Sequence, residues 1–302
     1  MKHRTLLCLL IAALISVVAT VQAGRIEVAS TEVGDYTRPT GKRAQVLKVV
    51  PHMAINDSWR SAVMVRNNAN RTIAITMDLL NSDGNLAQAS IFDGANENFR
   101  GSSFNLNLSP FEIIVLEFDQ ILTGEANLQA FFYSEDFDSE YSIETTYSSF
   151  EGQTKNATVG VFTDAPGPNF LINVDQRIDS YSERRKFRGM ALTNTSNESC
   201  DCRVSLFDAG LNGQNFQPLV TINLNSIPSG GKFLGITYDL FPSIDQLLGQ
   251  SPYGYLEFVC TQNVSALALA FENGTQISSS IPVDYFSFAQ TKDGETVRKF
   301  RK

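Results

Sequence analysis

Residues 188–208, RGMALTNTSNESCDCRVSLFD, carry the pattern on which the interpretation of the whole chain depends. Apolar side chains occupy every second position from Met190 to Leu192 and again from Cys202 to Leu206, and a polar run separates the two stretches. Alternation with a period of two residues is typical of half-buried β-strands. We therefore predict two strands joined by a turn, as in a β-hairpin.

An earlier stretch, residues 63–83, has the same organisation. It reads VMVRNNANRTIAITMDLLNSD, which is again an alternating run, a polar interruption rich in asparagine, and a second alternating run. The chain is therefore interpreted as a duplication. Asp83-Gly84 lies between two apolar runs, and this dipeptide predicts a further hairpin in which residues 86–92 return against residues 73–80.

The rest of the chain has the same pattern of short predicted strands separated by turns. Residues 128–133 and 141–150 are expected to form another hairpin around an acidic turn, and residues 254–260 and 264–271 are expected to repeat these two strands. No segment has the length of a crossover helix, so the sheets are expected to be antiparallel. Near-helical spacing at 238–248 predicts one short helix.

These patterns predict an all-β fold of two tandem antiparallel sandwiches, each of about seven strands. Residues 164–168, DAPGP, stop any regular element and mark the boundary between the two. The predicted domains are residues 44–163 and 164–290. Residues 24–43 are interpreted as an N-terminal arm, and residues 291–302 as a charged tail.

The first 23 residues have the features of a secretory signal peptide. Lys2 and Arg4 precede an apolar stretch at 6–18, and Val21-Gln22-Ala23 has the small-residue spacing of a cleavage site. The apolar stretch is shorter than the roughly 20 residues that a membrane-spanning helix needs. We expect an extracytoplasmic protein with no integral membrane segment after cleavage, whether it is periplasmic, secreted or bound to the cell surface.

The charge balance argues against nucleic acid as a partner. The 32 Asp and Glu residues outnumber the 24 Lys and Arg residues, two of which lie in the expected signal peptide, so the processed chain would carry a net charge of about −10. Such a chain has no general attraction for polyanions. Basic clusters at 184–188 and 298–302 are interpreted as a solvated strand entry and a frayed tail.

Three cysteines remain after residue 23. Cys202 and Cys260 share the parity of neighbouring core-facing residues, so they are the preferred disulfide pair, and Cys200 is the alternative partner. We expect no metal site here, because zinc would need a fourth ligand and His52 belongs to the other copy. The acidic turn at 135–140 is interpreted as a charged hairpin tip, with weak calcium binding as the alternative.

The sequence indicates no catalytic centre and no cofactor. His52 is the one histidine after residue 23, and no Gly-x-Ser-x-Gly element accompanies it. Nucleotide-binding glycine loops do not occur. Hydrolysis by a pair of carboxylates stays open as an alternative, because the two acids of such a site can come from anywhere in a fold.

Several short motifs recur in both copies. The first has Pro51-His52, Trp59, the strand end Val65-Arg66-Asn67 and Asp83-Gly84, and the second has GMALTN at 189–194 and Ile227-Pro228. In these motifs the chain resembles the tandem immunoglobulin-like β-sandwich repeats of secreted bacterial proteins. The resemblance implies an extracytoplasmic, non-enzymatic module, and it implies no site residues.

The resulting functional hypothesis is a secreted or surface-associated binding or structural protein, whose partner is a protein or a polysaccharide. The alternative is a carbohydrate-binding module or an accessory protein of a glycoside hydrolase. Trp59 is the sole tryptophan and is the candidate for stacking on a sugar ring, although burial in a core is the competing interpretation.

Overall fold

The computed structural model describes residues 25–39, 46–93, 97–134, 140–162, 165–179, 184–209, 217–249, 251–272, 276–291 and 296–301. Within these ranges nearly all regular structure is β-strand, and the strands pair in antiparallel fashion, as the sequence predicts. The expected signal peptide and residues 135–139 of the acidic turn lie outside them. No helix in the described part of the chain has the length and apolar character required to cross a bilayer.

Strands β1–β11, which we call the first unit, form two sheets. One has the order β1-β7-β4-β9-β2 and the other the order β11-β10-β3-β8-β5-β6. Alternate residues of strands in both sheets point into one shared hydrophobic core. The strands are β1 (Ile26–Ser30), β2 (Val46–Ala54), β3 (Trp59–Asn67), β4 (Ile73–Leu80), β5 (Ala89–Phe92), β6 (Asn98–Gly101), β7 (Ser103–Leu108), β8 (Ile113–Ile121), β9 (Asn127–Ser134), β10 (Tyr141–Glu151) and β11 (Thr154–Phe162).

Strands β12–β21, the second unit, surround a separate core. Its central element is β18, whose N-terminal half pairs with β12 and β15 and whose C-terminal half pairs with β14 and β19. The elements are β12 (Gly167–Asp175), β13 (Ile178–Asp179), β14 (Arg184–Asn194), β15 (Cys202–Asp208), β16 (Val220–Asn223), β17 (Lys232–Ile236), α2 (Thr237–Leu240), α3 (Ile244–Leu247), β18 (Tyr253–Glu272), β19 (Gln276–Ile281), β20 (Val283–Gln290) and β21 (Thr296–Phe300).

The strand pairings repeat between the two units. The order β7-β4-β9-β2 of the first unit corresponds to β16-β15-β18-β12 of the second, and β8-β3-β10-β11 corresponds to β17-β14-β18-β19. In the second unit the single strand β18 takes the places of both β9 and β10. This agreement in pairing supports the duplication that the sequence pattern indicates.

Two buried asparagines show the same repetition in atomic detail. The Asn67 side chain donates to the carbonyl oxygens of Arg71, Leu108 and Ser109, at 2.7, 3.2 and 2.8 Å. The Asn194 side chain likewise donates to three carbonyl oxygens, at 2.7, 3.0 and 3.0 Å. Each asparagine ends a strand, and its amide fixes the path of the chain as it leaves that strand.

The predicted hairpins are wrong, although the strands themselves are present. β14 pairs with β17 and β18, whereas β15 pairs with β16 and β18, so the two strands of residues 188–208 lie in opposite layers. The same holds for β3 and β4, and for β9 and β10. Asp83-Gly84 does form a tight turn, across which Leu80 and Leu86 make an antiparallel bridge, but β5 pairs with β6 and β8 and not with β4, so the predicted hairpin does not extend beyond the turn. Alternation reveals a half-buried strand but carries no information about its neighbour.

Other expectations need correction as well. Residues 254–260 and 264–271 belong to one continuous strand, β18, and the single predicted helix is two short ones, α2 and α3. Pro242 lies between these helices, and proline cannot continue the hydrogen-bond ladder of the first. Part of the expected arm forms β1, which pairs with β7, and part of the expected tail forms β21, which pairs with β20. Each unit also has more strands than the seven predicted.

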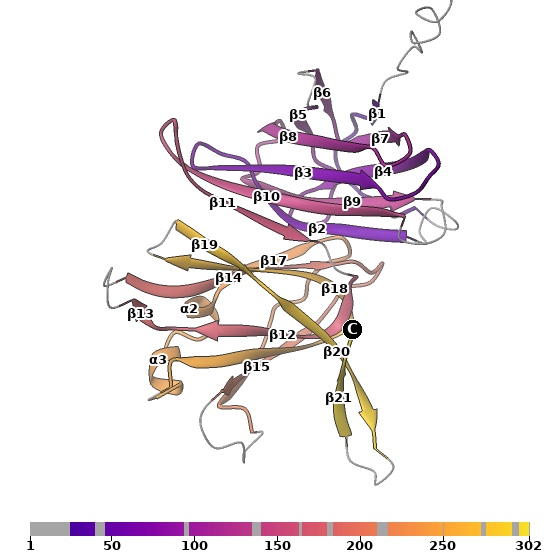
Figure 1. The fold of residues 1–302 in the computed structure, drawn as a ribbon. Coiled ribbons are helices and arrows are strands. Elements are labelled where there is room, and N and C mark those ends of the chain that lie inside the picture. The colour runs from indigo at the N-terminus through magenta and orange to yellow at the C-terminus, as the bar shows by residue number, and fades with distance from the viewer. Residues whose placement is uncertain are drawn as a thin grey trace, which may run out of the picture.

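The two units are in direct contact. Figure 1 shows β2 and β11 of the first unit facing β14, β17 and β19 of the second. The Thr193 hydroxyl lies 2.6 Å from Oε1 of Gln129, and the Lys232 amide donates to the Ser82 carbonyl oxygen at 2.9 Å. A third hydrophobic cluster joins Tyr147 of β10 to Leu267 and Leu269 of β18. The contact between the units is therefore a packed interface with buried hydrogen bonds.

Candidate functional site: a pocket between the two units

A pocket of about 500 Å³ lies where the two units meet. Its walls come from β2, β3, β10 and the start of β9 in the first unit, and from β14, β17, α2, β18 and β19 in the second. The volume lies within the range of about 300–1,000 Å³ that is usual for sites that bind small molecules. Neither unit alone supplies all the walls, so the pocket exists only where the units are joined.

Three aromatic rings form one wall. Phe187 of β14 is directly opposite Phe271 of β18, and the two rings stack with centroids 5.1 Å apart and planes 8° apart. Trp59 of β3 meets Phe271 edge to face at 6.2 Å, across the boundary between the units. Gly189 makes room for this wall, because a Cβ atom there would lie 2.6 Å from the Phe271 ring. Stacked and edge-to-face contacts of this kind stabilise aromatic clusters.

His52 and Tyr147 form a second part of the lining. Their rings are nearly parallel, with centroids 6.4 Å apart, and the Tyr147 hydroxyl donates to the backbone carbonyl oxygen of His52 at 2.5 Å. The register of β2 against β9 shifts between Val50 and Met53, which places a bulge at Pro51-His52. Val50 and Met53 both enter the core of the first unit, so the bulge turns His52 outward toward the second unit.

The ionisation of His52 is strongly affected by its surroundings. Burial lowers the pKa of the imidazole to about 3, and the nearby charge of Lys232 acts in the same direction. Nδ1 is buried and has no hydrogen-bond partner among the described residues. His52 is therefore a neutral imidazole at physiological pH.

Lys232 lies close behind the pocket and is almost completely buried, with 7% of its surface exposed. Its ammonium group donates to the Leu128 carbonyl oxygen of the first unit at 2.8 Å. Burial lowers the pKa of this amine to about 7. The lysine therefore serves as a hydrogen-bond link between the units, and its charge is held only weakly at neutral pH.

The lining of the pocket is largely apolar. The buried part consists of apolar and aromatic side chains, among them Met190 and Leu267, whereas Asn56 and Asp239 are exposed at the rim. The hydroxyl that reaches His52, that of Tyr147, contacts its backbone and not its ring. An apolar cavity with a few fixed polar groups is the usual composition of a small-molecule site.

The structure places Trp59, the candidate from sequence, in this pocket, where it is half-buried. Trp59 has the parity of the core residues Val63 and Val65, but it is the first residue of its strand and reaches Phe271 of the other unit. Sequence reasoning missed the contributions of Phe187 and Phe271, because the docking of one unit on the other leaves no periodic signal. The one available hint is Pro51, which favours a bulge within a strand.

The cysteines lie away from the pocket, in the core of the second unit. The structure joins Cys202 and Cys260 by a disulfide bond between directly opposite residues of β15 and β18. Cys200 is a buried free thiol whose Sγ lies 3.7 Å from that of Cys202. Burial raises the pKa of the Cys200 thiol, which disfavours the reactive thiolate.

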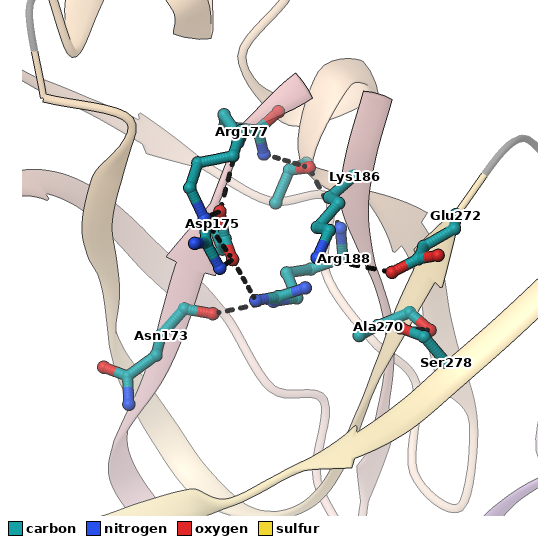
Figure 2. A network of polar contacts seen from close by, with 10 residues as sticks. Asn173, Asp175, Arg177, Lys186, Arg188, Ala270, Glu272 and Ser278 are labelled. Carbon is teal, nitrogen blue, oxygen red and sulfur yellow. Dashed lines mark hydrogen bonds and ion pairs between the residues drawn. The ribbon is translucent and has the colours of Figure 1, made fainter. Parts of the chain in front are cut away.

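The basic cluster at 184–188 is partly committed to internal ion pairs. Figure 2 shows Arg188 of β14 pointing toward Asp175 and Asn173 of β12, with Arg177 on the other side of the same carboxylate. Burial alone would raise the pKa of Asp175, but the hydrogen bonds and the charge of Arg177 outweigh it and lower the pKa. Lys186 pairs with Glu272 at 3.3 Å.

The network in Figure 2 therefore connects strands of the second unit, and it gives both Arg188 and Lys186 an acidic partner. The C-terminal cluster is engaged in a similar way. Arg298 forms an ion pair with Glu257, and its guanidinium lies 5.6 Å from the ring centroid of Phe286. In both clusters, therefore, some of the described basic side chains form ion pairs within the protein.

Comparison with known proteins adds no assignment. The chain matches no protein-family model, and no curated protein is significantly similar to it. The functional conclusion therefore rests on the geometry of the pocket.

Proposed function

We propose that this chain is a secreted or surface-associated, non-enzymatic binding protein, built of two tandem immunoglobulin-like β-sandwich domains, and that the pocket between the units is its ligand site. The single observation that carries the proposal is the pocket itself, an apolar cavity with walls from both units and with aromatic rings on its sides. The apolar stretch and cleavage motif in residues 1–23 support an extracytoplasmic location.

Trp59 makes the proposal directly testable, because it is the only tryptophan in the chain and it lines the pocket. Its emission should respond in a saturable manner to at least one member of a panel of charged and uncharged aromatic compounds and oligosaccharides. If no member of the panel changes the emission up to its solubility limit, the pocket is not a ligand site.

Two exposed leucines provide a matched pair of variants for this titration. Leu234 is 41% exposed and lines the pocket, whereas Leu219 is 42% exposed and does not. Leu234→Glu places a charge at the pocket wall and should weaken binding about tenfold or more, a cost of at least about 1.4 kcal/mol. Leu219→Glu should bind as the parent does. Equal affinities in the two variants would place the ligand elsewhere.

The alternative is a carbohydrate-binding module or an accessory protein of a glycoside hydrolase. The specific observation in its favour is that Trp59 lies beside polar rim groups such as Asn56 and Asn127, a combination that suits sugar rings. In the same titration, saturation by an oligosaccharide but not by apolar aromatic compounds would select this alternative.

The location is tested separately. We expect expression in a bacterial host to yield a processed protein that begins at Gly24 and is recovered outside the cytoplasm. Amino-terminal sequencing of the product would show this, and an intact amino terminus in the cytoplasmic fraction would contradict it.

A further inference from the structure

We propose that the pocket accepts an uncharged, planar and largely apolar molecule with one hydrogen-bond acceptor, and that the Nε2–H group of His52 donates to that acceptor. This inference rests on the proposed function, since it names the class of ligand for the same site.

The charges around the pocket exclude an ionic ligand from its interior. Three lining residues can titrate: Asp239 is exposed at the rim, and His52 and Tyr147 are neutral at physiological pH. The nearest buried cation, Lys232, is already bound to the Leu128 carbonyl oxygen. An anion or a cation that entered would lose its hydration, and no charged side chain of the buried lining would pair with it, because Asp239 is exposed at the rim and Lys232 is not a lining residue.

The tautomer of His52 follows from its two ring nitrogens. Nδ1 is enclosed by protein and lacks a partner among the described residues, whereas Nε2 is not one of the buried nitrogens that lack a partner. A buried acceptor without a partner is tolerated better than a buried donor without one. We therefore place the proton of the neutral ring on Nε2, and because His52 lines the pocket, this N–H group is the one assigned to donate to a carbonyl, ether or hydroxyl oxygen of the ligand.

The shape of the ligand follows from the rings in the lining. Phe187, Phe271 and Trp59 lie on one side, and His52 and Tyr147 contribute a nearly parallel pair. Aromatic surfaces of this kind bind planar π-systems by offset stacking and edge contacts. A volume of about 500 Å³ holds a molecule of two or three fused or linked rings.

The test is a set of four naphthalene derivatives of nearly equal size, measured as competitors of the uncharged fluorescent probe N-phenyl-1-naphthylamine in the full chain. They are naphthalene, 2-acetylnaphthalene, 2-naphthoate and the 2-naphthylmethylammonium ion. We expect 2-acetylnaphthalene to bind about 3- to 10-fold more tightly than naphthalene, the usual gain from one hydrogen bond. The two ions should bind at least about tenfold more weakly than naphthalene.

Two variants assign the hydrogen bond to His52. His52→Phe keeps an aromatic ring but removes the donor, so the preference for 2-acetylnaphthalene over naphthalene should disappear. His52→Gln restores an N–H donor and should recover part of the preference. Circular dichroism spectra matching the parent would show that both variants are folded.

Different outcomes overturn different claims. Tighter binding of either ion would overturn the inference about the ligand class and leave the pocket as a ligand site. A preference for 2-acetylnaphthalene that survives in His52→Phe would overturn the role of His52. If neither the probe nor any competitor changes the emission of Trp59, and the wider panel also gives no response, the proposed function itself fails.

Discussion

Asn67 and Asn194 occupy equivalent places in the two units, and each uses one buried amide to bind three carbonyl oxygens. Each carboxamide oxygen also accepts a backbone amide two residues later, from Ala69 and Ser196. Removal of either side chain would leave several buried groups without partners, and the cost of unpaired buried groups exceeds the net gain of an average hydrogen bond.

We therefore expect Asn67→Ala to lower the free energy of unfolding by about 2–3 kcal/mol, and Asn194→Ala to do the same. Asn68→Ala and Asn197→Ala are the matched controls, because both asparagines are exposed, and they should change it by less than about 0.5 kcal/mol. Urea unfolding followed by circular dichroism measures all four. A loss in Asn67→Ala no larger than in Asn68→Ala would contradict the anchoring role.

Lys232 predicts a specific pH dependence of stability. Its pKa is about 7 in the folded chain, below the value of roughly 10.4 for a free lysine, so the unfolded chain binds more protons between these two values. The contribution to stability is lost as the pH falls through the folded pKa. The free energy of unfolding should therefore rise from pH 7 to pH 9, by at most about 1.4 kcal/mol per pH unit.

Lys232→Met should abolish this rise, whereas Lys299→Met, at an exposed lysine, should retain it. Urea unfolding at pH 7, 8 and 9 provides the comparison. If the free energy of unfolding changes with pH in the same way for the parent and for Lys232→Met, Lys232 does not titrate in this range.

At the scale of elements, the long strand β18 and the disulfide belong together. Cys202 and Cys260 face one another at the last residue pair that β15 shares with β18, just before β18 turns to pair with β14. The bond therefore holds the strand at the point where it passes from one layer to the other, and it closes a chain segment with a sequence separation of 58.

Replacement of both cysteines by alanine should lower the free energy of unfolding by about 3–4 kcal/mol, because a disulfide across a segment of this length restricts the unfolded chain. Peptide mapping without reduction should link residues 202 and 260 and leave Cys200 free. A linked Cys200, or full stability of the double variant, would contradict this arrangement. Cys200→Ala is the control that leaves the disulfide intact.

The elements also show what sequence reasoning can and cannot reach. Alternation located most strands, because a half-buried strand must place one apolar side chain at every second position. Alternation failed to predict strand pairing. In residues 188–208 the polar run looks like a tight turn, yet Asn194 binds the segment at 227–228, and β15 pairs with β16 and β18 instead of with β14. Local pattern cannot report a hydrogen bond to a carbonyl more than 30 residues away.

At the scale of the whole molecule, the docking of the two units depends on a close backbone approach. Gly84 has a φ of +86°, and a Cβ atom there would lie 2.3 Å from the Ser229 carbonyl oxygen of the other unit. Gly124 has nearly the same φ, +88°, but nothing lies within 4 Å of the equivalent position. Both glycines therefore have a left-handed backbone conformation, but only Gly84 lies against the backbone of the other unit.

Gly124→Ala should lower the free energy of unfolding by about 1–2 kcal/mol, the cost of a left-handed conformation for a residue with a Cβ atom. Gly84→Ala should cost clearly more, since it also separates the units. Thermal unfolding of both variants measures the difference. Equal losses would mean that this approach contributes nothing to the docking.

The docking also explains why the site was beyond the reach of the sequence. His52 and Trp59 stand out in the sequence because each is the one residue of its type after residue 23. The residues that complete the pocket, Phe187 and Phe271, are two of the 21 phenylalanines and lie in strands of the other unit. Their role depends on how two folded units dock, and no spacing within either unit encodes it.

Because the walls of the pocket come from both units, a ligand bound there would contact both and stabilise their docking. Ligand binding and separation of the units would then oppose each other: the ligand raises the free energy needed to separate the units, and separation of the units releases the ligand.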